Sequence, residues 1–197
     1  HLPFNAPVRF WDLYNREDFS MPGNLGVPPG YPEYARNAKP GELQHYTDVP
    51  PGPDPREFST EMNKRLIHGY FACVSYTDRN VGKLLDALEQ SGEADNTIII
   101  LWSDHGWKLG DHYSWCKHTN FECDTQVPLV IVHPDIEAAK GTTEALVELV
   151  DLYPTLAELC GLEQPGHLQG RSLVPVLEDP TSAHREYAYS SYPHRGG

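Results

Sequence analysis

The sequence predicts an α/β domain, and three observations lead to this prediction. Residues 60–91 show a long amphipathic pattern, in which apolar residues recur every three or four positions. Residues 98–102 and 127–132 are two uninterrupted apolar runs bounded by turn-forming residues. A second helical pattern covers residues 152–160. Strand-sized apolar runs that follow helical patterns are typical of a sheet with helices packed against it.

The first helix has clear signals at both ends. Ser59 or Thr60 can accept a hydrogen bond from the first turn, and Gly92 suits the left-handed position just past the last turn. A single apolar stripe is expected along one face of this helix, formed by Leu66, Tyr70, Cys73, Val74, Thr77, Val81, Leu84, Leu85 and Leu88.

The two apolar runs are predicted to be strands. Ile98–Trp102 contains five large apolar residues in succession, which favours a strand buried on both faces. Val127–Val132 has its proline near the start, where a strand tolerates it best, and His133-Pro134 stops it.

The C-terminal third predicts a helix and then a weaker strand. Asp151 can cap a helix that runs from Leu152 to Cys160, with Pro154 in the first turn and Gly161 at the end. Residues 186–192 alternate loosely, as an antiparallel strand would. We therefore expect residues 1–180 to belong to one α/β domain and residues 181–197 to open a second, smaller subdomain.

Residues 20–56 are unusually rich in proline, with nine of the eighteen prolines in the chain. Such a stretch predicts a long irregular connection across the surface. Connections of this length often cover a functional site, although a plain surface wrap fits the sequence equally well.

Charge and hydropathy exclude two classes of function. The formal net charge is -13, which is the opposite of what a nucleic-acid-binding protein needs. No apolar run approaches the roughly 18 residues required to span a membrane. An anionic substrate would need a local cationic pocket or a metal ion, because the chain as a whole would repel it.

The four cysteines, at positions 73, 116, 123 and 160, contain no C-x-x-C pair. A bridge between Cys116 and Cys123 is compatible with their spacing, but buried free thiols are the more ordinary interpretation. The sequence therefore leaves the pairing and the redox compartment open.

The chemistry is expected where the first predicted strand ends. The strand runs directly into Ser103-Asp104-His105-Gly106, and ligands of open α/β sheets bind beyond the carboxyl ends of strands. Asp104 and His105 at that position are suited to hold a cation, with Gly106 allowing a sharp turn. The ordinary alternative is that Asp104 caps a turn and His105 packs in the core.

A second Asp-His pair and a lysine follow within a few residues. Asp111 and His112 repeat the first pair, so a four-ligand transition-metal cluster is one interpretation. Lys117 is a cation a short loop away from this candidate metal site. It could bind an anionic substrate group, or it could be an ordinary lysine facing solvent.

These segments together resemble the sulfatase family, and especially its iduronate-2-sulfatase branch. Residues 103–112, followed by Trp115 and Lys117, resemble the family motif S-D-H-G-x-x-L-G-x-H-x-x-W-x-K. Five further segments agree in order: the opening His1-Leu2-Pro3-Phe4, the helical Tyr70–Tyr76 piece, Asn120-Phe121 with Val127-Pro128-Leu129, the V-D-L-Y-P-T-L segment at 150–156, and Gly170-Arg171-Ser172-Leu173.

The resemblance implies a fold, a reaction and a set of roles. Sulfatases have an alkaline-phosphatase-like α/β fold with a small C-terminal α+β subdomain, of which this chain would be a part. They hydrolyse sulfate esters with a formylglycine, made from the cysteine of a C-x-[PA]-x-R motif, beside a calcium ion. Asp104 and His105 would be metal ligands, and Trp107 and Lys117 would bind substrate. Lys117 and His1 would be catalytic, His1 by contacting the sulfate or protonating the leaving oxygen.

The sequence departs from the family pattern in two respects. Calcium prefers oxygen ligands, so Asp104 with His105 would by coordination chemistry alone suggest zinc or manganese. None of the four cysteines has an arginine four residues later. We therefore expect the formylglycine motif, and the acidic ligands that precede it in the family, to lie upstream of His1, and this chain to be a fragment that is inactive alone.

The resemblance also implies partners and a location. A sulfated carbohydrate would be the substrate, the missing N-terminal half would be a packing partner, and residence would be periplasmic, secreted or lysosomal. Two alternatives stay open. One is a zinc-dependent phosphodiesterase or phosphatase of the same superfamily, which usually lacks the element seen at Trp115 and Lys117. The other is a non-catalytic remnant that binds sulfated glycans.

Overall fold

The structure is a computed structural model that describes residues 2–32, 41–52, 54–136 and 141–192. The chain divides into two compact units. Unit 1 combines residues 1–91, 105–127 and 192–197, and unit 2 combines residues 92–104 and 128–191. The long predicted helix therefore belongs to unit 1, and both predicted strands belong to unit 2. The predicted domain boundary at residue 180 stays a prediction.

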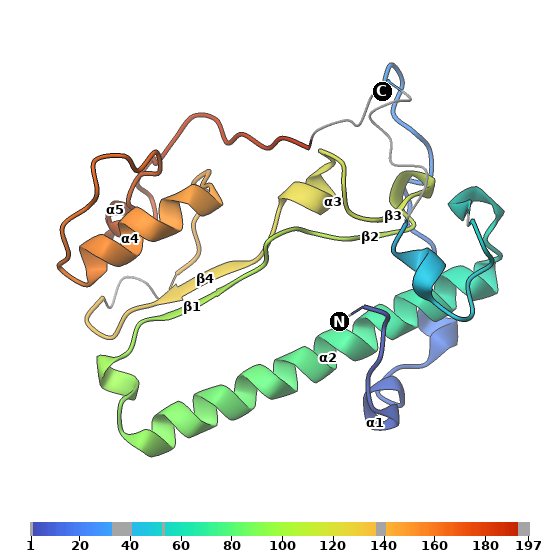
Figure 1. Cartoon of the computed structure of the whole chain (residues 1–197), viewed down its shortest axis with the longest axis horizontal. Coiled ribbons are helices and arrows are strands. Elements are labelled where there is room, and N and C mark those ends of the chain that lie inside the picture. The colour runs from blue at the N-terminus through green and yellow to red at the C-terminus, as the bar shows by residue number, and fades with distance from the viewer. Residues whose placement is uncertain (1, 33–40, 53, 137–140, 193–197) are drawn as a thin grey trace. The chain divides into compact units, whose positions relative to one another are not determined.

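Unit 1 is built on one long helix (Figure 1). This helix, α2 (Thr60–Ser91), is capped by Ser59, whose Oγ accepts a hydrogen bond of 3.1 Å from the backbone N–H of Met62. Gly92 follows the last turn with a φ of +76°, so both predicted ends are confirmed. The unit also contains α1 (Val8–Trp11), β2 (Lys108–Leu109), β3 (Trp115–Cys116) and α3 (Glu122–Thr125), with short 3₁₀ turns between them.

The core of unit 1 lies at the N-terminal half of α2. Trp115 is fully buried there, and its Nε1 donates a hydrogen bond of 3.2 Å to Oδ1 of Asn63. Leu43, also fully buried, comes from the proline-rich stretch, so that stretch enters the core and does not only wrap the surface. The buried apolar members are Leu43, Val49, Leu66, Ile67, Trp115 and Cys116.

The opening segment packs closely on α2. A Cβ atom added at Gly69 would lie 2.9 Å from the Trp11 ring and 3.1 Å from Cβ of Phe4. The close packing therefore requires glycine at this position of the helix. In the residue just before Gly69, a ring nitrogen of His68 lies 2.8 Å from the carbonyl oxygen of Trp11. These contacts fix Phe4, three residues after the chain begins, against the helix.

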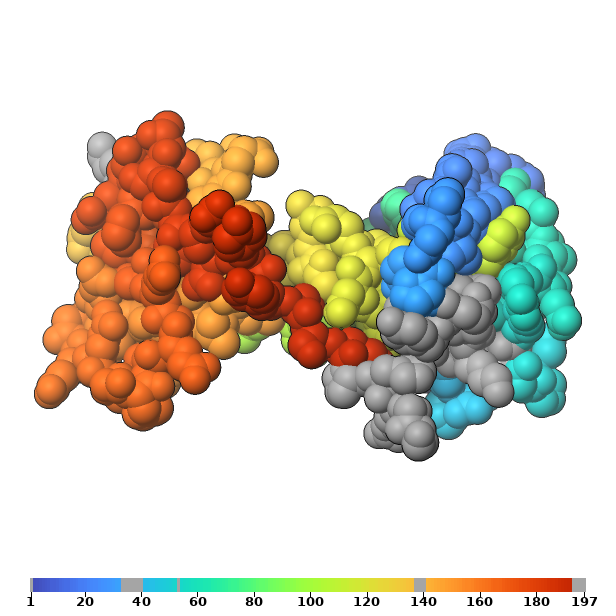
Figure 2. Space-filling model, turned by 90° about the horizontal axis from the view of Figure 1, so that it is seen from above, coloured from blue at the N-terminus to red at the C-terminus, as the bar shows by residue number. Residues whose placement is uncertain are grey.

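Unit 2 contains the two predicted strands, β1 (Ile99–Trp102) and β4 (Leu129–Val132), and the helices α4 (Leu152–Leu159) and α5 (Val174–Glu178). The strands pair antiparallel, with Ile100 opposite Ile131 and Trp102 opposite Leu129. In Figure 2 the orange and red residues of α4, α5 and the segments around them form one continuous body.

The prediction that residues 98–102 are buried on both faces is wrong for this chain. Leu101 and Trp102 are 46% and 51% exposed, and Val130 and Val132 on the partner strand are also exposed. Within the described residues β1 pairs with β4 alone, so the two-stranded sheet has too few neighbours to cover its faces.

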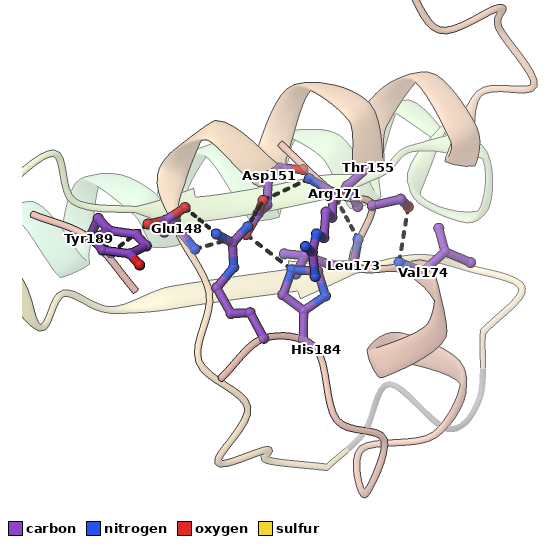
Figure 3. A network of polar contacts seen from close by, with 10 residues as sticks. Glu148, Asp151, Thr155, Arg171, Leu173, Val174, His184 and Tyr189 are labelled. Atoms are coloured by element: carbon purple, nitrogen blue, oxygen red, sulfur yellow. Dashed lines mark hydrogen bonds and ion pairs between the residues drawn. The ribbon is translucent and has the colours of Figure 1, made fainter. Parts of the chain in front are cut away.

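The segment that contains His184 and Arg185 is held by a buried carboxylate at the start of α4. Asp151 lies at the predicted N-terminal position of this helix, but its side chain makes no bond to the helix itself. The carboxylate instead accepts the backbone N–H groups of Glu148 and Arg171, at 2.9 and 2.8 Å, and contacts His184 at 3.1 Å and Arg185 (Figure 3). One fully buried side chain thus connects three segments of unit 2.

This network predicts an acid-sensitive contribution to stability. Burial by itself raises the pKa of the Asp151 carboxyl, but the backbone N–H groups of Arg171 and Glu148, with His184 and Arg185, lower it overall below its usual 3.8. The stabilisation is therefore present above pH 3.8 and is lost as the pH falls further. Asp151→Asn should cost about 1.5–3 kcal/mol at neutral pH, as expected for hydrogen bonds to a charged group.

Urea unfolding of the two proteins between pH 6 and 2 tests this expectation. The unfolding free energy of the unaltered chain should fall more steeply below pH 3.8 than that of Asp151→Asn. Parallel curves would show that the Asp151 carboxylate does not contribute in this way.

The predicted strand at residues 186–192 is absent. Residues 187–192 have no strand partner in the structure, and Tyr187 and Tyr189 are exposed. The backbone N–H of Tyr189 instead donates to the carboxylate of Glu148, at 2.5 Å (Figure 3). The Glu148 carboxylate thus accepts a backbone hydrogen bond that a neighbouring strand would otherwise accept.

The described helices include none with the length and apolar character needed to cross a membrane.

Candidate active site

A short hairpin brings together two of the predicted site residues. Strands β2 and β3 pair antiparallel, with Lys108 opposite Cys116 and Leu109 opposite Trp115. Trp107 precedes the first strand and Lys117 follows the second, so both lie at the open end of the hairpin. Gly110 begins the turn with a φ of +106°, which an L-residue with a side chain rarely adopts.

The indole ring of Trp107 is the centre of the candidate site in unit 1. The Nζ atom of Lys117 lies 5.1 Å from the centre of this ring, within the range of a cation–π contact. The centres of the His105 and Phe4 rings lie 6.3 and 6.0 Å from the same ring. Three predicted site residues therefore meet, together with Phe4 from the opening segment.

Lys117 is neither a solvent-facing lysine nor an isolated one. Its side chain is 16% exposed, and its ammonium forms an ion pair with the carboxylate of Glu42. Burial alone would raise the pKa of the Glu42 carboxyl, but the ion pair with Lys117 and a hydrogen bond with the Cys116 thiol lower it overall. Glu42 is therefore held as a carboxylate beside the lysine.

The backbone around Lys117 is strained. Cys116 and His118, the residues on either side of it, have φ values of +66° and +80°, and His112 and Tyr113 at the hairpin turn have 53° and 52°. Such conformations are uncommon for residues with a side chain and cluster at functional sites, where the surrounding structure enforces them. The strain supports the interpretation that the position of Lys117 matters for function.

A buried ion pair anchors the segment that carries His105 and Trp107. The ammonium of Lys108 contacts Oδ2 of Asp124, which also accepts the backbone N–H of Thr119 at 3.0 Å. The Lys108 and Asp124 side chains are 0% and 3% exposed. The backbone N–H of Gly106 donates to the Asp124 carbonyl at 2.8 Å, and a Cβ on Gly106 would lie 2.0 Å from the backbone oxygen of Cys123. Only glycine allows this approach.

The second Asp-His pair does not form the predicted transition-metal cluster. Asp111 accepts the backbone N–H of Leu109 at 3.1 Å. His112 donates from Nδ1 to the Gly26 carbonyl at 2.8 Å and stacks on Phe121 at 4.1 Å. Both side chains thus shape the hairpin and pin the loop near residue 26. Among the described residues no group of three or more histidine, cysteine, aspartate or glutamate side chains could hold a metal.

The first Asp-His pair has donors that fit only part of a metal site. His105 Nδ1 lies 2.8 Å from the Gly106 carbonyl, which can only accept, so a neutral His105 ring carries its proton there and Nε2 is the nitrogen able to bind a metal. Asp104 is exposed and belongs to unit 2, whereas His105 belongs to unit 1. One carboxylate and one imidazole are far fewer than the about six to eight oxygen ligands of calcium.

The remaining sequence predictions concern His1 and the cysteines, and the structure also shows charged residues that the sequence did not indicate. His1 lies outside the described residues. The four cysteines are free thiols, which excludes the Cys116–Cys123 bridge from this structure. Sequence reasoning missed Glu42, Lys108 and Asp124, because no pattern links positions 42 and 117 or positions 108 and 124 before the hairpin is built.

The chain belongs to the sulfatase family. A family model described as Sulfatase matches residues 20–162. A sulfatase from Formosa agariphila is 34% identical over 194 residues, covering 98% of this chain and 36% of that protein. Mouse iduronate 2-sulfatase is 37% identical, covering 84% of this chain and 35% of the enzyme. The chain therefore spans about a third of the length of these relatives.

Solved structures are similar to this chain in fold. A protein solved in complex with its substrate D-glucosamine-2-N,6-O-disulfate is similar with a TM-score of 0.75 and 26% identity, over 98% of this chain and 50% of that chain. A phosphonate monoester hydrolase from Silicibacter pomeroyi has a TM-score of 0.76 and 26% identity, over 95% of this chain and 37% of its own. The chain thus has part of the alkaline-phosphatase-like α/β fold, as predicted.

Proposed function

We propose that this chain is part of an enzyme that hydrolyses sulfate esters of a sulfated carbohydrate. The observation that carries the proposal is that His105 and Lys117 both lie beside the indole ring of Trp107, in a member of the sulfatase family. The relatives include iduronate 2-sulfatase and a protein solved with a disulfated glucosamine, which supports a sulfated sugar as substrate.

The proposed roles follow from the charge of the substrate. Lys117 neutralises negative charge on the sulfuryl oxygens, more strongly in the transition state, and Trp107 packs against the substrate. His1 contacts the sulfate or gives a proton to the leaving alkoxide oxygen. Asp104 and His105 would contribute two ligands to a calcium ion, whose charge would further stabilise those oxygens.

We propose that a formylglycine nucleophile and the remaining metal ligands come from a segment upstream of these 197 residues. Two facts support this: no cysteine here has an arginine four residues on, and the relatives are about three times as long. The same segment would cover the exposed apolar residues of β1 and β4. A periplasmic, secreted or lysosomal location is carried over from the family.

A longer form that includes the upstream segment tests the proposal directly. Supplied with calcium, it should release the alcohol of a chromogenic sulfate ester. The likeness to a phosphonate monoester hydrolase makes that reaction the second candidate. The matched phosphonate monoester in the same assay separates the two, because a sulfatase should turn over the sulfate ester faster.

The chain by itself is expected to be inactive and to bind calcium weakly or not at all. It lacks the C-x-[PA]-x-R motif, and its two candidate metal ligands are fewer than calcium needs. Incubation with a chromogenic sulfate ester, and calcium titration followed by calorimetry, measure both properties. Turnover that survives purification and disappears in Lys117→Ala would contradict this expectation.

A further inference from the structure

We infer that Glu42 is an internal competitor for the anion that Lys117 binds: its carboxylate occupies the ammonium until a sulfate ester displaces it. The inference rests on the proposed role of Lys117 and adds a residue from the proline-rich stretch to the site. It concerns unit 1 alone, which contains both side chains.

The backbone next to Glu42 is fixed, so the contact is built into the fold. Glu42 precedes the short 3₁₀ turn Leu43–His45, and Leu43 is fully buried in the core of unit 1. On the other side of the contact, Lys117 follows Cys116, which is also fully buried. Two anchored segments therefore hold the carboxylate against the ammonium, while both side chains remain partly accessible, at 26% and 16%.

The hydrogen bonding of Glu42 differs from that of a satisfied structural ion pair. Its Oε1 contacts Lys117, but its Oε2 is buried and has no hydrogen-bond partner among the described residues. A partly buried ion pair with an unsatisfied oxygen contributes little net stability, because its attraction does little more than offset the cost of removing the charges from water. Stability alone is therefore a poor reason for this carboxylate to be here.

Electrostatics makes the two anions mutually exclusive. The Glu42 carboxylate is ion-paired with the Lys117 ammonium, so an anion that reaches the ammonium arrives beside this carboxylate. Like charges at such a separation repel strongly in a partly buried site. Sulfate must therefore displace Glu42, and removing the Glu42 charge should strengthen sulfate binding about tenfold, a value that allows for screening by solvent.

Competitive acetylation of the intact 197-residue chain tests the inference, with inorganic sulfate as the probe. Mass spectrometry measures the acetylation rate of each lysine. In the unaltered chain Lys117 should react slowly, and only high sulfate concentrations should slow it further. In Glu42→Gln, which keeps the size of the side chain, Lys117 should react several times faster. Half-maximal protection should then need about one-tenth of the sulfate, since the competing charge is gone.

The matched control is Glu61→Gln, which removes the same charge from the same unit. Glu61 pairs with Arg16 at 2.9 Å on the surface and is 63% exposed, so this variant should leave Lys117 unchanged. Thermal unfolding followed by circular dichroism must show that both variants are folded.

The possible results separate this inference from the proposed function. Equal sulfate protection of Lys117 in the unaltered chain and Glu42→Gln would overturn the competition and leave the anion site standing. A faster reaction in Glu42→Gln without any protection by sulfate would overturn both, because Lys117 would then bind Glu42 and no sulfate.

Discussion

Replacing Lys117 by alanine in a longer, active form should lower turnover of a sulfate ester by about 10²–10³-fold, the usual loss when one charge-stabilising donor is removed from an active site. The structure gives a physical reason to expect this. The Lys117 side chain is 16% exposed and its ammonium lies over the Trp107 ring. The residues on either side of Lys117 have left-handed backbone conformations. A lysine held so firmly is suited to meet charge that develops at one defined position.

The pair with Glu42 requires a second variant, because Lys117→Ala also leaves a partly buried carboxylate without its cation. Combining Lys117→Ala with Glu42→Gln removes this unpaired negative charge. Thermal stability should recover in the double variant, whereas turnover should stay low. Lys64→Ala is the matched control, since Lys64 forms an ion pair with Glu17 at 2.9 Å in the same unit. Recovery of turnover together with stability would assign Lys117 a structural role only.

Local signals in the sequence were sufficient for α2 and α4, but not for the short helices α1, α3 and α5. Ser59 and Gly92 delimit α2 as predicted, because a hydroxyl cap and a left-handed glycine act on the nearest turn and depend little on the remainder of the chain. Gly161, with a φ of +64°, follows α4 in the same way as Gly92 follows α2. The strand near Trp102 was also found, but its burial was not, since burial depends on which neighbours cover the sheet.

The candidate site was only partly predicted, because it also depends on contacts that form when the chain folds. Trp107 and Lys117 lie ten residues apart and meet through a hairpin whose strands have only two residues each, too short to produce an alternating pattern. Asp111 and His112 looked like metal ligands, yet their hydrogen bonds go to backbone groups. A pair of residue types indicates which ligands are available, and only the backbone decides where they point.

The buried pair behind this hairpin gives the second large effect, in this case on stability. Lys108→Met should lower the free energy of unfolding by about 3–5 kcal/mol, because it leaves the Asp124 carboxylate buried without its cation. The double variant Lys108→Met with Asp124→Leu should lose much less, since neither charge is then buried alone. Arg16→Met, which breaks an exposed pair with Glu61, should cost less than about 1 kcal/mol.

Guanidinium unfolding of the four proteins, followed by far-UV circular dichroism, provides the comparison. A loss in Lys108→Met no larger than that in Arg16→Met would mean that water reaches Asp124. It would also remove the physical basis for regarding this pair as the anchor of the site. Because Asp124 binds Lys108 through its side chain and Gly106 through its backbone, the expected loss should loosen the segment between them. That segment carries Trp107, so the fluorescence of the chain should change in Lys108→Met before global unfolding begins and should stay unchanged in Arg16→Met.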